Sequence, residues 1–515
     1  MSHRVQVVWF KRDLRLEDHA PLALAARAGT VLPLYVIEPE QLYAPDFDRL
    51  HYDFLLESLT ELRAGLASLG QPLIVRLGEI TSVLRQIAVT HPLAALWSHA
   101  ESGTGVARAR DERVRAWSRE HSIPWYELPQ NGVFRGLARR DGWRRLWFER
   151  MSLPVARMPQ RLAALPGLEI GSIPLATELG LSAHAPAVRG RKDVARGGES
   201  RGWALLDSFL SERGANYPRG ATSPLTAFQA SSRLSPYLAW GCLSTRTVYQ
   251  RTVAAGKALI ANGSISPLGV AFTPGALESF TVRLRMRCDH LQSLESSPAI
   301  ETRCIDGACE ELRAEDRAVL TQAWCSGRTG YPLVDACMRA LQAEGWLHFR
   351  GRALVTAFAA NQLWIDWRRL KNFLARQFLD YEPAVHFMEL QTVSGSAGRR
   401  ALKIYDPVRE SRELDPAGEF IRRWVPELAL LAQSAIHEPW TMTAVQQRDF
   451  GCRLGRDYPL PIVEQSAALA QARARLKQLQ RLAPELAPGA ALPNIDASGQ
   501  WNITLPPPRE PPPAP

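Results

Sequence analysis

A pair of serines and a Ser-Pro step near the middle of the chain could together bind an anion. The segment Ser231–Leu238 reads SSRLSPYL, so Ser235 stands directly before Pro236. Serine followed by proline is a strong helix start, and the amide groups at a helix N-terminus attract anions. The hydroxyls of Ser231 and Ser232 would add hydrogen-bond donors for a pyrophosphate. The alternative is an ordinary serine-capped helix that binds nothing.

Paired arginines and an acidic residue that could neutralise one of them occur in two later segments. The first, Thr329–Arg352, reads TGYPLVDACMRALQAEGWLHFRGR and contains a predicted helix that begins at Pro332 and stops at Gly345. The second, Asp380–His386, supplies the acid, Asp380. A buried charge pair is costly unless its hydrogen bonds are satisfied, so such a pair indicates a functional site more than a source of stability.

The order and content of these three segments resemble the FAD pocket of the photolyase/cryptochrome family. Two further runs share the resemblance, VVWFKRDLRLEDHAPL (Val7–Leu22) and IYDPVRESRELDPAGEFIRRWVPEL (Ile404–Leu428). The resemblance implies a light-dependent FAD flavoprotein, namely a deoxyribodipyrimidine photolyase that splits UV-induced pyrimidine dimers in DNA by electron transfer from reduced FAD. The alternative on the same fold is a cryptochrome-like blue-light photoreceptor without repair activity.

The resemblance also implies, residue by residue, which side chains hold the cofactor. Arg352 and Asp380 correspond to the ion pair beside the isoalloxazine ring, where positive charge would stabilise a reduced flavin. Glu382 stands where the family commonly has aspartate, so the carboxylate is kept on a longer arm. The predicted cofactor-binding set is Ser231, Ser232, Leu234, Ser235, Arg287, Trp346, Arg350, Arg352, Asp380, Glu382 and His386.

One departure from the family pattern concerns the position next to the reactive flavin nitrogen. Photolyases usually carry asparagine there, and this chain has His386. A histidine at that position could donate a proton or stabilise an anion, and it would titrate near physiological pH. The alternative is a histidine that only packs. We predict a catalytic role for His386 at the flavin.

A second departure concerns the tryptophan chain that re-reduces the flavin in the family. Trp324 and Trp367 match two of its members, but the member nearest the flavin aligns with Leu390. Electrons cannot hop through leucine, so either another aromatic residue serves or the electron route differs. The candidates are Trp364, one helical turn before Trp367, and Trp346. The alternative is that all four tryptophans are core residues, which is the commoner fate of tryptophan.

The substrate side of the pocket departs from the pattern as well. Where photolyases that split cyclobutane dimers carry a glutamate and a tryptophan, this chain has Arg283 and Met286. A further stacking tryptophan aligns with Thr392, and the pocket asparagine aligns with Phe349. The resemblance therefore does not settle the lesion. Around Ala100–Asp111 the folate-contacting Asn-Glu pair is missing, which leaves the identity of any second antenna chromophore open.

Strands that alternate with helices are predicted for the first part of the chain. Strand-length apolar runs are Val5–Phe10, Val31–Ile37, Gln71–Arg76 and Leu93–Trp97, and helices are expected over Leu50–Leu69 and Val106–Glu120. This alternation indicates an α/β domain with a parallel, Rossmann-like sheet covered by helices on both faces.

Composition and periodicity divide the chain into four regions. Residues 1–135 form the α/β domain, and the proline- and glycine-rich residues 136–202 form a long connecting segment. Residues 203–480 form a mostly α-helical FAD-binding domain. Periodicity is lost beyond Arg475, and the proline-rich residues 481–515 form an extended or disordered tail.

The charge balance is compatible with a nucleic-acid partner. The 515 residues carry a net charge of +10 and have a pI of about 9.4, with arginine as the main cation. Arginine matches phosphate geometry, although an arginine-rich composition can also simply fill the surface. We expect damaged DNA to bind to the arginine-rich helical domain. No apolar run is long enough for a membrane span and no signal peptide is present, so we expect a cytoplasmic monomer without a membrane partner.

Overall fold

The first part of the chain forms a five-stranded parallel sheet, as predicted. The computed structural model describes residues 4–137, 139–182, 194–313, 315–398, 404–482, 494–495 and 501–502. The strands are β1 (Val5–Phe10), β2 (Val31–Ile37), β3 (Ile74–Leu77), β4 (Leu93–His99) and β5 (Trp125–Leu128). Their order in the sheet is β3-β2-β1-β4-β5, and each neighbouring pair is parallel.

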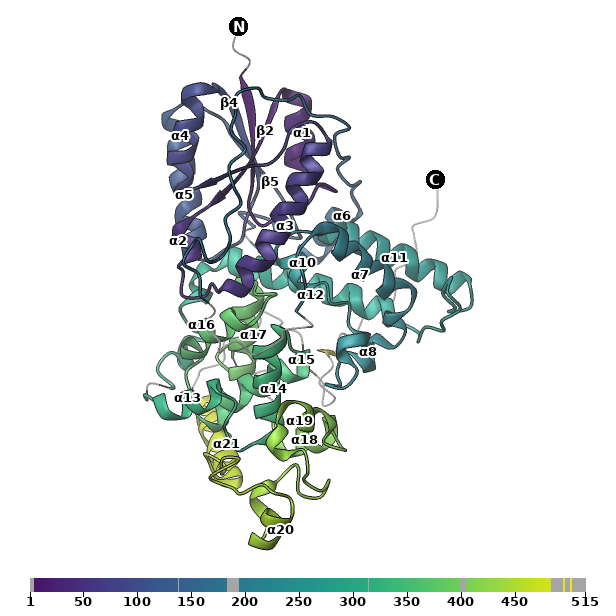
Figure 1. Cartoon of the computed structure of the whole chain (residues 1–515), viewed down its shortest axis with the longest axis vertical. Helices are drawn as coiled ribbons and strands as arrows, with labels where there is room; N and C mark the ends of the chain where they lie inside the picture. The colour runs from purple at the N-terminus through teal and green to yellow at the C-terminus, as the bar shows by residue number, and fades with distance from the viewer. Residues whose placement is uncertain are drawn as a thin grey trace.

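Helices cover both faces of this sheet (Figure 1). The helices of this part are α1 (Ala20–Ala28), α2 (Pro39–Leu42), α3 (Arg49–Ser68), α4 (Ile80–Thr90) and α5 (Gly105–Glu120). Side chains alternate between the two faces along β1, as they do in any strand. Val8 and Phe10 pack into the core that contains α1 and α3, whereas Val7 and Trp9 pack into the core that contains α4 and α5.

Strand β3 begins later than the apolar run Gln71–Arg76 predicted. The backbone N–H of Gln71 donates to the Leu66 carbonyl at the end of α3, at 3.2 Å. Pro72 has no N–H to give to a strand ladder. Gln71 therefore bonds to the end of α3 instead of to a neighbouring strand, and pairing with β2 starts at Ile74.

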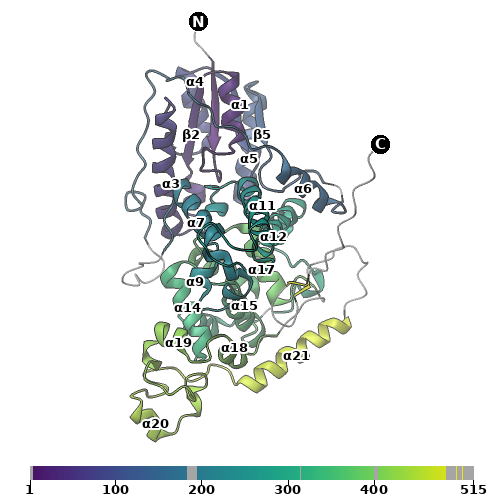
Figure 2. The same ribbon diagram turned by 90° about the vertical axis from the view of Figure 1, so that its right-hand side faces the viewer.

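The segment predicted as a connection, residues 136–202, contains a helix. Helix α6 (Trp143–Ser152) buries Trp143, Trp147 and Met151 against Cys288 of the helical part. These three residues are spaced one helical turn apart, so the helix is amphipathic although it is short and rich in arginine. After α6 the chain runs outside the sheet, where the N–H of Val75 donates to the Ile170 carbonyl at 2.9 Å (Figure 2).

The second half of the chain is helical, as predicted. Its helices are α7 (Glu199–Ser211), α8 (Tyr217–Gly220), α9 (Ala227–Ala230), α10 (Ser235–Ala239), α11 (Thr245–Ala261), α12 (Ala276–Ser296), α13 (Ala318–Cys325), α14 (Pro332–Glu344), α15 (Phe349–Ala357), α16 (Trp367–Gln377), α17 (Pro383–Ser394), α18 (Pro407–Leu414), α19 (Glu419–Trp424), α20 (Ala444–Asp449) and α21 (Gln465–Leu482). Helix α14 has the predicted limits, because proline opens it and Gly345 caps it at a φ of +67°. Helix α21 continues past Arg475, because its last turns consist of good helix formers.

The helical part packs against the loop that follows β1. Gly241, just after α10, has a φ of +68°, and a Cβ atom there would lie 2.2 Å from the carbonyl oxygen of Arg12. Arg15 Nη1 donates to the carbonyl of Gly241 at 3.0 Å. Only glycine combines this backbone conformation with so close an approach.

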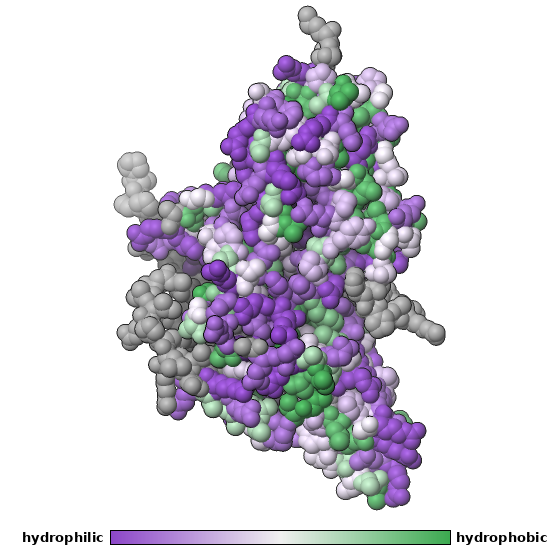
Figure 3. Space-filling model, turned by 90° about the vertical axis from the view of Figure 1, so that its left-hand side faces the viewer, coloured by the Kyte–Doolittle hydropathy of each residue, from purple (hydrophilic) through white to green (hydrophobic). Residues whose placement is uncertain are grey.

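The surface and the C-terminal tail add little to the architecture. The face in Figure 3 is mainly hydrophilic, with a small apolar group in its lower half, which is ordinary for a folded chain. None of the helices in the described ranges is long and apolar enough to cross a membrane. Of the predicted proline-rich tail, the two-residue strands β6 (Asn494–Ile495) and β7 (Trp501–Asn502) pair antiparallel, and most other tail residues lie outside the described residues.

Candidate functional site

Two adjacent cavities, here called the outer and the inner lobe, lie in the helical part. The outer lobe has a volume of about 540 Å³, and the inner lobe, about 50 Å³, lies between α15 and α17. The outer lobe is bounded mainly by α8, α12 and the loop before α10. The outer volume is within the usual range for ligand pockets. Residues that line both lobes are His290, Phe349, Arg352, Asp380, Glu382, Val385 and Glu389.

An ion pair joins α15 to the turn before α17 at the junction of the lobes. Arg352 Nη2 donates to Asp380 Oδ2 at 2.7 Å, and Arg352 Nε donates to the Leu347 carbonyl at 2.7 Å. The guanidinium group lies over the ring of Phe378, 4.1 Å from its centroid. Asp380 Oδ1 is buried and has no hydrogen-bond partner among the described residues. A buried acceptor without a donor is expensive, so this oxygen is a candidate contact for a bound ligand.

A second ion pair fixes α12 against α17. Arg287 Nε and Nη2 donate to the two carboxylate oxygens of Glu382 at 2.6 and 2.5 Å, and Nη2 also donates to the Leu238 carbonyl at 2.9 Å. Burial alone would lower the pKa of Arg287, but the Glu382 carboxylate raises it. The longer arm of glutamate thus spans the distance between the two helices, and both predicted residues lie on the outer lobe.

The serine segment lies on the wall of the outer lobe, but it does not cap a helix as predicted. Ser231, Ser232 and Ser235 line this lobe, whereas Leu234 is fully buried. Helix α10 starts at Ser235 and is five residues long, and its N-cap is Leu234 without a side-chain capping bond. The Ser232 hydroxyl instead accepts the N–H of Leu234 at 3.4 Å. The hydroxyls therefore reach the cavity from an irregular turn.

Arg233, within the same turn, was not singled out by sequence analysis. It has a φ of +61° and its guanidinium group lies between two rings, 3.8 Å from the centroid of Phe228 and 4.2 Å from that of Trp346. Burial lowers its pKa to about 10, and its Nη1 has no partner within the described ranges. The side chain lines the outer lobe and is suited to an anionic ligand. The SSRLSP motif contained this residue, but its aromatic neighbours are distant in sequence.

His386 lies in the inner lobe in a state that differs from the prediction. Its Nε2–H donates to the Lys371 carbonyl at 2.8 Å, because a carbonyl can only accept. Burial lowers the pKa of His386 to about 4, so the ring is neutral at physiological pH. Because of this burial, the prediction that His386 titrates near physiological pH is wrong. Its unprotonated Nδ1 remains as a hydrogen-bond acceptor.

Two further titratable residues, His290 and Glu389, line both lobes. The sequence alone did not identify them. Burial lowers the pKa of His290 to about 4, and its Nδ1 has no partner among the residues that the structure describes. Glu389 follows His386 by one turn of α17, and burial raises the pKa of its carboxyl group. The amphipathic pattern around Glu389 is weak, so the sequence did not indicate which face of α17 meets the cavity.

Arg350 does not line the cavity, although it was predicted to contact the flavin with Arg352. Its Nη2 donates to Glu410 of α18 at 2.6 Å. Residues two apart on a helix point in different directions, so the two arginines of the FRGR sequence cannot both face one cavity. The Arg350–Glu410 pair instead joins α15 to α18.

Comparisons with known proteins agree with this geometry. The family model described as DNA photolyase matches residues 6–142, and the one described as the FAD binding domain of DNA photolyase matches residues 280–478. The chain is 32% identical to a deoxyribodipyrimidine photo-lyase of Streptomyces griseus over 495 residues, which cover 93% of this chain and 99% of the relative. It is 29% identical to a cryptochrome DASH of Gloeobacter violaceus over 494 residues, 92% of this chain and 96% of the relative. The crystal structure of a class III photolyase from Agrobacterium tumefaciens matches with a TM-score of 0.80 and 25% identity, covering 93% of this chain and 98% of that one.

The chain belongs to the photolyase/cryptochrome family.

Photolyase/cryptochrome proteins bind FAD through the domain matched here, and the cavity suits that group. Its polar wall offers the hydroxyls of Ser231 and Ser232 and the partly unpaired guanidinium of Arg233, which fit a diphosphate. The junction offers a cation and a free carboxylate oxygen from Arg352 and Asp380. The donor and acceptor set therefore fits FAD, and the predicted cofactor is confirmed.

The two tryptophans that the family resemblance assigns to electron transfer, Trp324 and Trp367, and the candidate replacement Trp364 lie away from both lobes. Trp324 and Trp367 are fully buried in the helical core, where their indole N–H groups donate to the Val355 carbonyl and the Cys304 sulfur. Neither lobe is lined by them or by Trp364, whereas Leu390 lines the inner lobe.

Trp364 has an unusual electrostatic setting. It follows a π-helical turn (Phe358–Gln362) and has a φ of +56°. The guanidinium groups of Arg313 and Arg475 each lie 4.5 Å from its ring. Positive charge on the indole would be repelled by both cations, so Trp364 is a poor site for a transferred electron hole.

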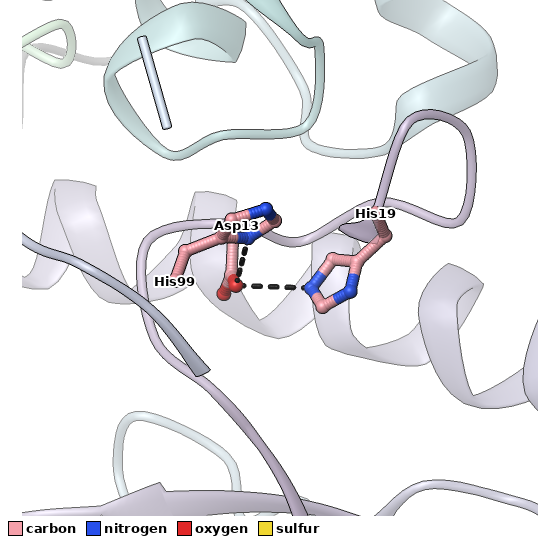
Figure 4. A group of neighbouring side chains, drawn as sticks. All are labelled: Asp13, His19 and His99. Atoms are coloured by element: carbon pink, nitrogen blue, oxygen red, sulfur yellow. Dashed lines mark hydrogen bonds and ion pairs between the residues drawn. The ribbon is translucent and has the colours of Figure 1, made fainter. Parts of the chain in front are cut away.

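The α/β part holds a buried Asp13–His19–His99 group that resembles a metal site in composition (Figure 4). Asp13 Oδ2 is hydrogen-bonded to His19 Nε2 at 2.9 Å and to His99 Nδ1 at 2.8 Å. The N–H of Leu22 donates to His19 Nδ1, so the ring proton is on Nε2 and points at Asp13. A metal at that nitrogen would require an imidazolate. The group therefore has a structural role, as a set of buried hydrogen bonds.

A second cavity of about 110 Å³ lies at the carboxyl edge of the sheet. Arg110 on its wall forms a buried charge network with Glu38, Glu101 and Asp111. Burial raises the pKa of Glu38 to about 7. The edge of a parallel sheet is a common ligand position, and a second antenna chromophore here stays a prediction.

Proposed function

We propose that the chain is a DNA photolyase that uses light to split UV-induced pyrimidine dimers. The observation that carries this proposal is that the two lobes are adjacent and share seven lining residues. The junction contains the Arg352–Asp380 pair, and the outer lobe reaches the surface at the exposed residues Gly275 and Glu278. A nucleotide extruded from DNA could therefore enter the outer lobe and come to lie beside the cofactor, as enzymes that act on flipped bases require.

The residues of the chain have distinct roles in this reaction. FAD, when bound and reduced, supplies the electron that light makes available. Arg352, held by Asp380, favours negative charge at the junction of the lobes. Arg283 lies over the Phe349 ring at 5.0 Å in the outer lobe, where its N–H groups can bind the carbonyl oxygens of a pyrimidine. Arg287 and Glu382 hold the two walls of the lobe at a fixed separation.

Damaged DNA is the partner we propose, and binding should depend strongly on salt. The chain carries a net charge of +10, and arginines that meet phosphates release counterions from DNA. The photolyase of Streptomyces griseus and the class III photolyase, both similar over nearly their full length, support this partner. A cytoplasmic location, a monomeric state and the four-region division of the chain remain predictions, with α6 moved to the helical region.

A cryptochrome-like photoreceptor is the second candidate. It is favoured by Arg283, Met286 and Phe349, which line the outer lobe where the family resemblance leads us to expect a glutamate, a tryptophan and an asparagine. The similarity to a cryptochrome DASH at 96% coverage of that relative supports it equally. A photoreceptor would keep the cofactor chemistry without binding a lesion.

Repair of defined lesions by the reduced protein tests the proposal. The FAD-loaded protein is reduced, mixed with an oligonucleotide that contains one cyclobutane thymine dimer, and illuminated, and restored thymines are measured by chromatography. We expect repair in light and none in darkness. Arg283→Ala should lower the repair rate and retain the flavin, whereas Arg145→Ala on the exposed face of α6 should change neither. Retained flavin without repair of cyclobutane or (6-4) lesions would contradict the proposal and favour the photoreceptor.

A further inference from the structure

Among the described residues, the wall of the inner lobe has no tryptophan and one oxidisable aromatic residue, Tyr381. Tyr381 lies in the turn between α16 and α17 and is only 5% exposed. Its ring meets that of His386 edge to face, with centroids 5.2 Å apart. Leu390 lines this lobe at the position where the family resemblance places the tryptophan nearest the flavin. A donor in direct contact with this lobe must therefore be another side chain of its wall.

The phenol of Tyr381 has a proton acceptor in place. Its O–H donates to Asp46 Oδ2 at 2.6 Å, across the boundary between the helical and α/β parts. Burial and the negative charge of Asp46 hold the pKa of Tyr381 well above its usual value, so the phenol keeps its proton in the resting state. Asp46 is half-buried and lines the cavity at the sheet edge, so its carboxyl group has a route to water.

The other oxidisable residues on the cavity wall have the opposite electrostatic setting. The ring of Trp346 lies 4.2 Å below the guanidinium of Arg233, which repels positive charge on the indole. The Tyr217 phenol interacts with Arg283, a cation that cannot accept a proton. Loss of an electron from Tyr381 with transfer of its proton to Asp46 leaves no positive charge on the ring. Tyr381 is therefore the residue at the wall whose oxidation is best accommodated.

We infer that Tyr381, hydrogen-bonded to Asp46, is the redox-active residue that reduces the flavin in this chain. The phenolic O–H bond breaks, the proton passes to Asp46 Oδ2, and one electron passes from Tyr381 to the light-excited flavin. An external thiolate then gives one electron to the tyrosyl radical and becomes a thiyl radical, and the proton returns from Asp46 to the phenol oxygen. The inference rests on the FAD cofactor and is independent of the proposed repair reaction.

Identification of the radical tests this inference. The FAD-loaded protein is illuminated without added reductant, frozen, and measured by electron paramagnetic resonance. We expect a neutral tyrosyl signal in the wild type and in Tyr126→Phe, a control at an exposed tyrosine of β5. Loss of the signal in Tyr381→Phe, with retained flavin, is the expected result. A tryptophan radical in the wild type, or an unchanged tyrosyl signal in Tyr381→Phe, would overturn the inference.

The proton transfer is tested separately at Asp46, which lines the sheet-edge cavity and not the flavin lobes. Flavin photoreduction with an added thiol should slow in D₂O for the wild type. Asp46→Asn should reduce the photoreduction rate and abolish its dependence on D₂O, even if Tyr381→Phe fails to hold the cofactor. Wild-type rates and isotope dependence in Asp46→Asn would overturn the role of the pair. Chemically reduced Tyr381→Phe should repair DNA like the reduced wild type, so absence of repair in both would contradict only the proposed function.

Discussion

The hydrogen bonds within the protein determine which atoms of the cavity residues remain for a ligand. His386 gives its single N–H to Lys371 and stays neutral, so only its Nδ1 is left to meet a cofactor. Asp380 uses one oxygen for Arg352 and leaves the other without a partner among the described residues. The sequence could identify both residues through their neighbours in the chain. It could not show their state, because Lys371 lies on a different helix.

The ion pair at the junction gives a direct prediction. Asp380→Ala leaves the guanidinium of Arg352 without its carboxylate in a largely buried position, and removes the free acceptor oxygen. Breaking a buried pair in this way costs about 3–5 kcal/mol. We expect flavin content, measured by absorbance after gel filtration, to fall sharply. Asp141→Ala, at an exposed Arg139–Asp141 pair, should retain full flavin content. Full retention in Asp380→Ala would show that the pair does not hold the cofactor.

At the scale of elements, local sequence signals succeeded where one segment carried the whole pattern. The limits of α14 followed from Pro332 and Gly345, and β1 and β2 followed from their apolar runs. Helix α6 was missed because its buried face consists of three residues whose partner, Cys288, is far along the chain. The cap of α10 was misassigned because the turn at Arg233 adopts a positive φ that serine-proline spacing does not indicate.

Helix α6 should be a structural part of the helical region. Trp147 is fully buried, packs against Tyr249 with centroids 5.0 Å apart, and lies beside Gly132. Trp147→Ala should lower the free energy of unfolding by about 3–5 kcal/mol, as for other buried tryptophans. Urea unfolding followed by circular dichroism measures this change. The exposed-face variant Arg145→Ala should change it by less than about 0.5 kcal/mol. A similarly small effect of Trp147→Ala would show that α6 is only a loosely attached connection.

Across the whole molecule, buried neutral histidines couple stability to pH. Burial lowers the pKa of His99 and His348 to about 3, and that of His290 and His386 to about 4, from an ordinary value of 6.5. Below about pH 6.5 the unfolded chain binds protons that the folded chain excludes. The stability that these histidines give is therefore present above pH 6.5 and is lost as the pH falls toward 4.

The free energy of unfolding in urea should accordingly be lower at about pH 5 than at about pH 7.5. His290→Gln should make this difference smaller, because one group that gains a proton only on unfolding is removed. His121→Gln, at the exposed end of α5, is the matched control. Equal pH dependence in His290→Gln and the wild type would indicate that His290 is already charged in the folded protein.

The close fit of Gly241 against the carbonyl of Arg12 has a consequence for engineering. A chimera that took its α/β half from one relative and its helical half from another would have to inherit both sides of this contact from a single parent. A single crossover point should therefore lie before the β1 loop or after α10, and not between them. The same contact leaves little freedom for a hinge there, so a light signal would have to leave the protein by a local rearrangement of side chains or helix ends.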